Sequence, residues 1–454
     1  MARGTAGLGA GVGEPGSVRW AGLVSSPWMD LVQGTVWTPH RELVVLSRST
    51  GDTIDGSALL TLSKYAPSGE LLWSRELRHV SRWWGLGFYD VRNLLAVGPD
   101  GSLVLAGHER GDTHLGGEWW VHDAYLAKLD ADGNPLWARS FPVSEFPLLL
   151  NALAVDARGA IAIGGVVTGP VDFGGQTLER ADKAFVARYL PDGTLDWVRA
   201  ISPEPRSTYG TQASVNGLAV DAEGNVVAAG SYTGTLFPGG ATASGWIGAP
   251  FLIQWNAQGE MTWGKDFGAL QGELLVAGGS PDGHVAAAGR FLGQLSWGGT
   301  SVTADSRDYW TSFLVVAGAR GEERAARSLR EAHVGALTVD PRGRVYVGGN
   351  GPGDLDLGGG PMMETPLDQL FVARYSLDAA HEWSRTFANA RPGPWGSYLG
   401  DRYVRSLAVT PGRSLVMGGN IQLPTDFGGT VLAPMDGPDA PYVAPDGFLL
   451  QLGP

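Results

Sequence analysis

Aromatic and arginine side chains gather in the connections between the apolar runs of this chain. One connection, HVSRWWGLGFYDVRN, holds two adjacent tryptophans, and another, RPGPWGSYLGDRYVR, mixes aromatic rings with arginines. Such side chains are enriched where proteins bind partners, and aromatic rings also stack against sugars. We therefore expect a binding surface for a protein or a glycan, formed by Trp28, Trp83, Trp84, Tyr89, Arg206, Tyr209, Trp395, Tyr398, Arg402 and Tyr403. For any single ring, the alternative is a packing role.

Histidines and carboxylates raise the question of a metal site. The stretch HERGDTHLGGEWWVHDA holds three of the eight histidines, namely His108, His114 and His122, with Glu109, Asp112 and Glu118 among them. A zinc site needs imidazoles that converge on one ion, and this spacing matches no standard zinc pattern. The sequence favours a solvated polar loop here and no metal.

Aspartates also recur at one position of a repeated pattern, directly before an apolar run. They are Asp55, Asp123, Asp182, Asp308, Asp368 and Asp446. A carboxylate at the entrance of a strand commonly accepts backbone N–H groups and stabilises a turn. The DFGG turns at Asp172 and Asp426 lack the dense oxygen ligands of calcium loops. We expect all of these residues to be structural.

Familiar catalytic motifs are absent from the chain. It has no cysteine, no G-x-S-x-G, no H-E-x-x-H and no P-loop, and nothing indicates a cofactor. The sequence therefore predicts a non-enzymatic protein. The alternative is a hydrolase or lyase that acts on a polysaccharide, with two carboxylates among Glu118, Glu145 and Asp401 as acid and base, about 5–9.5 Å apart.

A sevenfold repeat must position these connections. Each copy has four short apolar runs, and a turn glycine precedes the fourth run at Gly69, Gly133, Gly193, Gly259 and Gly321. A tryptophan follows four residues later in copies one to four, whereas copy five has Ala325 instead. In copy six, Ala380 takes the glycine position and Trp383 follows. Copies with four short strands predict an all-β, seven-bladed β-propeller of four-stranded blades.

The two ends of the chain complement each other. The seventh copy stops before its tryptophan run, and residues 17–24 near the start read SVRWAGLV, with Trp20 in the expected place. Pairing the two ends would remove unprotected strand edges. We therefore expect the N-terminal strand to close the ring by completing blade seven. Residues 1–15 are expected to be a flexible Gly-rich tail, and residues 16–454 a single propeller domain.

The repeat text resembles a known family. GLAVDAEGNVVAAG, VDFGG, ADKAFVARYLPDG and DAYLAKLDADGNPLW are similar to the bacterial SBBP-type β-propeller repeat. The resemblance covers copies two to seven well and copy one weakly. It implies a bacterial surface or secreted protein, and no particular activity or catalytic residue.

Composition limits the partners. The net charge of −13, without a long Lys/Arg cluster, argues against nucleic acid. No apolar run reaches about 18 residues, so no membrane insertion is expected. The start of the chain does not read as an intact signal peptide. From the resemblance we expect a secreted or cell-surface location, with the cytoplasm as the alternative. The predicted function is a binding scaffold, and a subunit of a larger assembly is one form of it. Its site is expected on the ring face that carries the long, variable connections.

Overall fold

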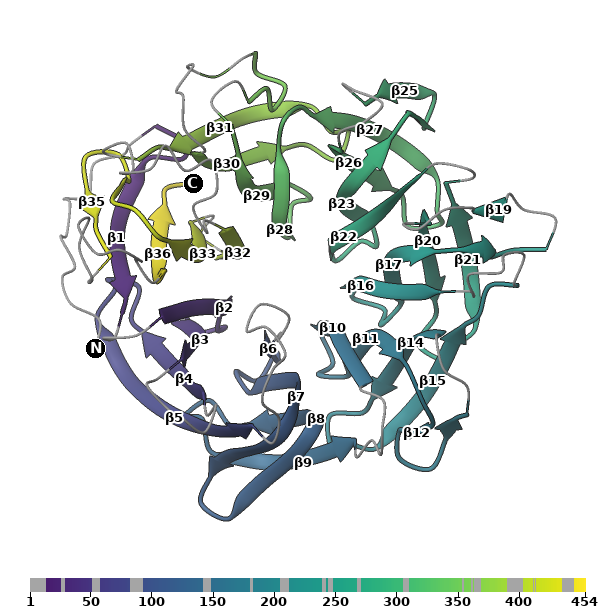
Figure 1. Cartoon of the computed structure of the whole chain (residues 1–454), viewed down its shortest axis with the longest axis horizontal. Helices are drawn as coiled ribbons and strands as arrows, with labels where there is room; N and C mark the ends of the chain where they lie inside the picture. Colours follow the sequence, from purple (N-terminus) through teal and green to yellow (C-terminus); the bar gives the residue numbers. More distant parts are fainter. Residues whose placement is uncertain are drawn as a thin grey trace.

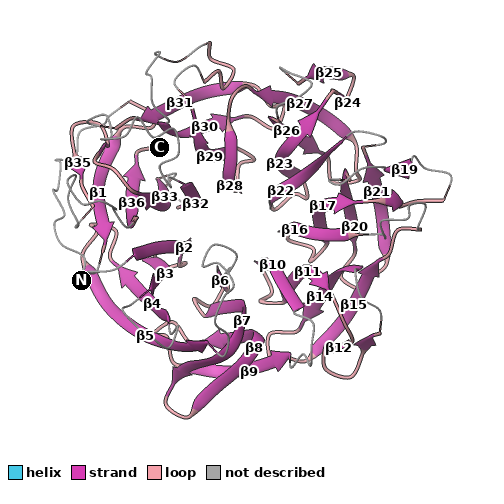
Figure 2. Cartoon of the chain, in the orientation of Figure 1, coloured by secondary structure: helices cyan, strands magenta, loops and turns pink. Residues whose placement is uncertain are grey.

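The computed structural model describes residues 14–25, 29–50, 58–81, 93–141, 148–179, 183–204, 212–238, 242–243, 248–267, 271–304, 310–352, 355–360, 362, 369–389, 403–410, 412, 414–434 and 445–454. These residues form seven antiparallel blades around a central channel (Figure 1). Figure 2 shows strands and loops and no helix in this part of the chain. It follows that no helix long and apolar enough to cross a membrane occurs among the described residues. The predicted seven-bladed propeller is confirmed.

Each blade has four strands, ordered from the channel outward. Blades one to three contain β2 (Met29–Trp37), β3 (Leu43–Thr50), β4 (Ala58–Tyr65) and β5 (Leu71–Ser81); β6 (Asn93–Val97), β7 (Leu103–Gly116), β8 (Trp119–Leu129) and β9 (Pro135–Phe141); and β10 (Leu148–Val155), β11 (Ile161–Val167), β14 (Lys183–Tyr189) and β15 (Leu195–Ile201). Blades four and five contain β16 (Ala213–Val220), β17 (Val226–Tyr232), β20 (Ala249–Trp255) and β21 (Met261–Asp266); and β22 (Gln271–Gly279), β23 (Val285–Leu292), β26 (Thr311–Ala317) and β27 (Glu323–Leu329).

The ring is completed by two further blades. Blade six contains β28 (His333–Val339), β29 (Val345–Gly351), β30 (Gln369–Tyr375) and β31 (His381–Phe387), and blade seven contains β32 (Tyr403–Val409), β33 (Leu415–Ile421), β36 (Asp446–Leu452) and β1 (Val18–Val24). Short two-stranded ladders lie between the second and third strands of four blades: β12 (Val171–Asp172) with β13 (Thr177–Leu178), β18 (Gly234–Thr235) with β19 (Thr242–Ala243), β24 (Gln294–Trp297) with β25 (Thr300–Thr303), and β34 (Thr425–Asp426) with β35 (Val431–Leu432).

The first strand of the chain closes the ring, as predicted. β1 pairs antiparallel with β36 at the outer edge of blade seven. Here the chain ends reproduce a turn that is covalent in the other blades. The Gly453 N–H donates to the Ser17 carbonyl (2.7 Å), and the Gly16 N–H donates to the Gly453 carbonyl (3.3 Å). In blade three the second of these bonds runs from Gly193 to Leu190 (2.9 Å), within one continuous turn. Glu14 and Pro15 both accept bonds from Arg385 of blade six.

The repeated tryptophan joins neighbouring blades. The Trp197 indole N–H of blade three donates to the Ala257 carbonyl in a turn of blade four (3.1 Å). The turn glycine of that blade, Gly259, lies against the same ring, and a Cβ there would be 2.8 Å from it. Trp137 of blade two and Trp263 of blade four donate in the same way to the carbonyls of Pro191 in blade three and Ala319 in blade five. The glycine therefore serves two needs, a positive φ of 76° and room for the neighbouring indole.

Blade six corrects one predicted position. Ala379, not Ala380, occupies the turn-glycine place, because its N–H closes the turn onto Ser376 (3.0 Å) and its φ is 52°. Ala379 and Ala325 belong to the same buried cluster between blades five and six. Blade five carries Ala325 where other blades carry tryptophan. With no indole in that place, a methyl group is accommodated at the turn.

Sequence reasoning did not single out an arginine that recurs two residues after the tryptophan position. It recurs as W-x-R in blades two and three and follows Ala325 in blade five, and it donates to the turn carbonyl of the next blade: Arg139 to Gly193, Arg199 to Gly259, and Arg327 to Ala379. The hydrogen bond from this guanidinium to the turn carbonyl thus connects the same two blades as the hydrogen bond from the tryptophan indole. The repeat encodes blade-to-blade contacts as well as strands.

The histidine-rich stretch is not a loop, so that prediction is wrong. β7 and β8 continue as a long hairpin past the edge of blade two. β7 pairs with β5, which merges blades one and two into one sheet. Leu115 and Val121 are buried against blade one. Buried and exposed residues alternate along this hairpin, as they do in a strand. The many polar residues on its outer face made the segment look like a loop in the sequence.

Candidate binding site at the channel mouth

The sequence-predicted binding residues fall almost entirely outside the described residues. Tyr403 is the exception, and it begins β32 on the inner side of blade seven with 41% of its surface exposed. The Arg405 guanidinium lies 5.0 Å from its ring centroid. The residues outside the description are Trp28, Trp83, Trp84, Tyr89, Arg206, Tyr209, Trp395, Tyr398 and Arg402. Their role in binding stays a prediction.

Six of the seven innermost strands carry a β-bulge at one shared level of the channel. In six blades the strand register shifts at this position, which is occupied by Gln33, Asn151, Asn216, Leu275, Gly335 or Arg405. Asn93 stands at the same level in blade two, at the start of β6. A bulge turns the side chain of the extra residue away from its normal direction. We call these seven residues the bulge belt.

Amides of the bulge belt join neighbouring inner strands. The Asn151 Nδ2 group of blade three donates to the Val215 carbonyl of blade four (3.1 Å), and the Asn216 Nδ2 group of blade four donates to the Leu274 carbonyl of blade five (2.8 Å). Gln33 accepts the Asn93 N–H through Oε1 (3.4 Å). The amides therefore hold the channel wall together, and they also make it polar.

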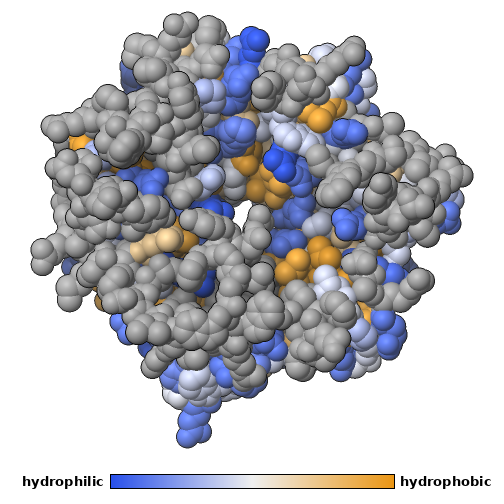
Figure 3. Space-filling view, viewed as in Figure 1, coloured by the Kyte–Doolittle hydropathy of each residue, from blue (hydrophilic) through white to orange (hydrophobic). Residues whose placement is uncertain are grey.

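Five residues of the belt line a cavity of about 210 Å³ in the middle of the channel, namely Gln33, Asn151, Asn216, Gly335 and Arg405. Residues from all seven inner strands line it. Figure 3 shows the corresponding hollow at the centre of the ring, with hydrophilic and apolar described residues around it. We refer to this space as the channel cavity.

A larger hollow of about 400 Å³ lies at one end of the inner strands of blades three to five. We call it the mouth pocket. It is lined by the ends of β11, β17 and β23 and the beginnings of β16 and β22, where the long connections of the blades attach. Its polar lining consists of Thr168, Gln212, Ser214, Ser231, Thr233, Glu273 and Arg290. The size is in the range of small-ligand sites.

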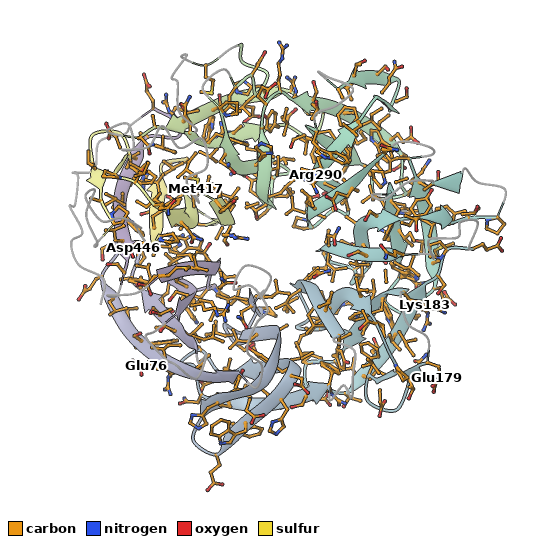
Figure 4. All side chains as sticks on the ribbon, viewed as in Figure 1. Glu76, Glu179, Lys183, Arg290, Met417 and Asp446 are labelled. Atoms are coloured by element: carbon orange, nitrogen blue, oxygen red, sulfur yellow. The ribbon has the colours of Figure 1, made fainter. Side chains whose placement is uncertain are left out.

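An ion pair forms one wall of the mouth pocket. Arg290 Nε and Nη2 lie 2.7 and 2.6 Å from the same Glu273 oxygen, Oε1. The guanidinium also lies 4.9 Å from the ring centroid of Trp310, within cation–π distance. Arg290 is labelled among the side chains in Figure 4. These contacts restrict the guanidinium before any ligand arrives.

Hydrogen bonds connect the mouth pocket with the channel cavity. Ser214 lines the pocket, and its hydroxyl donates to Asn216 Oδ1 (2.6 Å) and accepts from Asn151 Nδ2 (3.3 Å). Both asparagines line the channel cavity. The two hollows therefore share one polar network. Sequence reasoning missed it, although both asparagines stand two residues before the repeated LAVD text.

The DFGG turns are structural, as predicted. Asp172 Oδ1 accepts the N–H groups of Gly174 (2.9 Å) and Gly175 (2.7 Å), and Asp426 accepts the Gly429 N–H in the same way. Of the aspartates before the third strand, Asp55, Asp182, Asp308 and Asp368 lie outside the described residues. For Asp123 and Asp446 the predicted turn role stays a prediction.

Acid should weaken the Asp172 turn. The N–H groups of Gly175 and Gly174 hold the pKa of this carboxyl below its usual value. A pKa that is lower in the folded than in the unfolded chain stabilises the fold above the unfolded pKa of about 4, and this contribution disappears as the pH falls through the folded value. Asp172→Asn keeps an acceptor oxygen and removes the titration. We expect urea unfolding of the variant to depend less on pH below about 4; an unchanged pH dependence would contradict this account.

The histidine-rich hairpin lies on the rim. His122 Nδ1 is 2.5 Å from Asp112 Oδ1, and the His114 and Trp120 rings contact each other, tilted by 37° with 4.6 Å between centroids. Within the described part of the chain, no three His, Asp or Glu side chains are grouped to hold a metal ion. Glu118, one of the carboxylates considered for catalysis, lies at the exposed tip of this hairpin; Glu145 and Asp401 lie outside the described residues.

Comparisons with known proteins give a fold and no family. The chain matches no protein-family model and no curated protein. Among solved structures it is similar to the Dos1 propeller (8% identity, 97% of this chain and 94% of that chain, TM-score 0.44). It is also similar to an ulvan lyase of polysaccharide lyase family PL25 (11%, 91% and 93%, 0.46) and to XC5397, a gluconolactonase from Xanthomonas campestris (15%, 74% and 91%, 0.34). These likenesses concern the fold alone.

Proposed function

We propose that this chain is a non-enzymatic binding propeller that holds a glycan in the mouth pocket. The observation that carries the proposal is the pocket itself: about 400 Å³, with hydroxyls, an amide and a Trp310-backed ion pair around one hollow. Sugars offer many hydroxyl groups, each able to donate and accept, and apolar ring faces. Clustered hydroxyl and amide side chains satisfy the first feature. Aromatic rings of the neighbouring connections, which the sequence predicts to be part of the site, would satisfy the second.

Rigidity supports binding at this place. The pocket residues lie at the ends of paired strands, and Ser214 is held by two asparagines of the bulge belt. A preformed wall loses little conformational entropy when a ligand binds. The predicted aromatic connections, including Trp83 and Trp395, would extend this surface toward a longer glycan or a protein partner.

Several features of the proposal rest on sequence alone. The resemblance to the SBBP-type repeat favours a bacterial surface or secreted protein. It also leaves room for a role as a subunit of a larger assembly. In this role the ring would act as a scaffold that presents the glycan site.

The carboxylates support binding rather than hydrolysis. Among the described residues that line the mouth pocket, Glu273 is the single carboxylate, and its Oε1 is bound to Arg290. Glycoside hydrolysis commonly needs two carboxyl groups about 5–9.5 Å apart. An enzyme that acts on a polysaccharide is the alternative function. Release of reducing ends from a polysaccharide by the purified chain would favour this alternative.

A glycan array tests the proposal. We expect the purified chain to bind selected glycans equally with calcium and with chelator. The double change Glu273→Gln/Arg290→Gln keeps the net charge and should weaken binding at least about tenfold, because two charge-assisted contacts are lost. The control Lys265→Gln/Glu323→Gln removes an exposed ion pair on the outer strands and should bind as the wild type does. A silent array, or a pocket variant that binds normally, would refute the glycan site.

A further inference from the structure

We propose that the glycan site continues from the mouth pocket onto blades six and seven, where His333, Asn350 and the ring of Tyr403 contact further sugars of the same chain. This inference rests on the proposed function, because the first sugar would occupy the mouth pocket. The ligand class is then an oligosaccharide of several residues and not a single sugar.

One register position sets the level of the mouth pocket on the inner strands. In blades four and five, the residue two places before the bulge lies opposite a residue of the second strand: Ser214 pairs with Ser231, and Glu273 with Arg290. All four residues line the mouth pocket. Side chains of directly opposite residues lie on the same face of a sheet. We call the cross-strand pairs at this position the mouth pairs.

Blades six and seven have mouth pairs of their own. His333 pairs with Asn350, and Tyr403 with Asn420. In each of these inner strands the next residue is buried, whereas His333 and Tyr403 are exposed. The inner strands β22, β28 and β32 follow one another around the channel (Figure 1). The same register therefore places these two mouth pairs beside the ion pair of blade five, at the same end of the channel.

The mouth pair of blade six offers polar groups to a ligand. The His333 side chain is exposed and the Asn350 side chain is half-buried. Neither makes a side-chain hydrogen bond to another residue in the described part of the chain. An amide carries both donors and an acceptor, and a neutral imidazole carries one of each. Sugar hydroxyls, which donate and accept, match both side chains.

Blade seven adds an aromatic ring. Tyr403 has 41% of its surface exposed, and its contact with the Arg405 guanidinium restrains the ring. The apolar face of a sugar can pack against such a ring. Its mouth-pair partner has another role, because Asn420 is 2% exposed and its Oδ1 accepts the Val32 N–H of blade one (3.1 Å). Blade seven therefore presents Tyr403 to a ligand.

The neighbouring mouth pairs give the site a direction. In blade three the pair is Leu149 with Val166, whose side chains cannot form hydrogen bonds. In blade one it is Leu31 with Arg48, and these residues are only 8% and 4% exposed. Among the described strands, accessible polar or aromatic mouth pairs thus run from blade four to blade seven. A glycan that leaves the mouth pocket would find its next partners on blade six.

Oligosaccharides of increasing length test this inference by calorimetry. The probes are cello-, manno- and chito-oligosaccharides from the dimer to the hexamer. In at least one series we expect the hexamer to bind at least about tenfold more tightly than the dimer, because it reaches the polar pair of blade six and the Tyr403 ring as well as the mouth pocket.

Two variants assign this gain to its residues. His333→Ala/Asn350→Ala and Tyr403→Ala should each lower the ratio of hexamer to dimer affinity by at least about threefold, while the dimer affinity and the melting temperature stay unchanged. His40→Ala is the control. It removes an exposed histidine from the turn between β2 and β3, at the other end of the inner strands, and should keep the ratio.

The outcomes separate this inference from the proposal on which it rests. A hexamer that binds no more tightly than the dimer, a ratio that is unchanged in either variant, or binding of no series would overturn the continuation onto blades six and seven. If the dimer binds and its affinity is lost in Glu273→Gln/Arg290→Gln, while chain length has no effect, the mouth-pocket proposal stands and the continuation fails.

Discussion

A chain that lacks residues 1–24 is expected to lose its cooperative fold. The deletion removes β1, which carries the buried Trp20 and Ala21 and covers the edge of β36. Loss of a buried tryptophan alone costs about 3–5 kcal/mol, which is comparable with the whole stability of many domains, about 5–15 kcal/mol. The open edge of β36 would also invite aggregation. Circular dichroism melting and the soluble fraction measure both effects.

Two variants separate ring closure from a general truncation effect. Deletion of residues 1–13 leaves Glu14, Gly16 and β1 in place and should melt as the full chain does. A circular permutant that joins Gly453 to Gly16 through two residues, with new ends in the exposed turn of blade two, should fold, because it makes the broken turn of blade seven covalent. An unchanged melting temperature after deletion of residues 1–24 would refute closure as a source of stability.

The blades were predictable because their turns have a strict requirement. A glycine with positive φ recurs before each tryptophan strand, and few other residues adopt that conformation at low cost. The exception in blade six was assigned to the wrong residue. Ala379 takes the glycine place and packs in one cluster with Ala325 of blade five, which stands where other blades have tryptophan. We expect the missing indole to be what admits the methyl group, a dependence that acts across two blades. This relation between two blades cannot be recognised from the pattern within a single copy of the repeat.

The candidate site was less predictable than the fold. Asn151 and Asn216 look like ordinary residues of an inner strand, because a bulge leaves no mark on hydrophobic alternation. Arg405 follows the predicted Tyr403 by two residues, yet its place in the channel depends on the bulge of β32. Glu273 and Arg290 come from strands of one hairpin, and their meeting at the pocket follows from register. Variation between the repeats pointed to the connections as the binding site, whereas the described pocket is formed by the ends of strands.

Replacement of Trp197 by alanine is expected to destabilise the protein by about 3–5 kcal/mol. The indole is only 4% exposed, packs between blades three and four, and donates to the Ala257 carbonyl. Gly259→Ala should also destabilise, since it adds about 1–2 kcal/mol of backbone strain and about 1–3 kcal/mol of crowding against that indole. Guanidinium chloride unfolding of the two single variants measures these costs.

The double variant Trp197→Ala/Gly259→Ala should be more stable than the sum of the single changes implies. Without the indole, the nearest neighbour left for the new methyl group is Arg199 Nη2, 2.8 Å from the Cβ position. This atom ends a flexible side chain and can shift, so mainly the backbone strain of Gly259→Ala remains. The expected coupling is about 1–3 kcal/mol. Gly299 supplies the control, because its φ of 75° matches the 76° of Gly259 while no atom lies within 4 Å of its Cβ position. Gly299→Ala therefore measures the backbone cost alone.

Ala325 and Ala379 already provide the natural form of this double variant, since one methyl replaces the indole and the other replaces the turn glycine. If the two changes at Trp197 and Gly259 prove additive within about 0.5 kcal/mol, the indole is not what excludes a side chain at the turn. The presence of Ala379 would then need another cause. If the coupling is found, the tryptophan and the glycine of adjacent blades act as one unit, and the propeller repeat extends across the boundary between its blades.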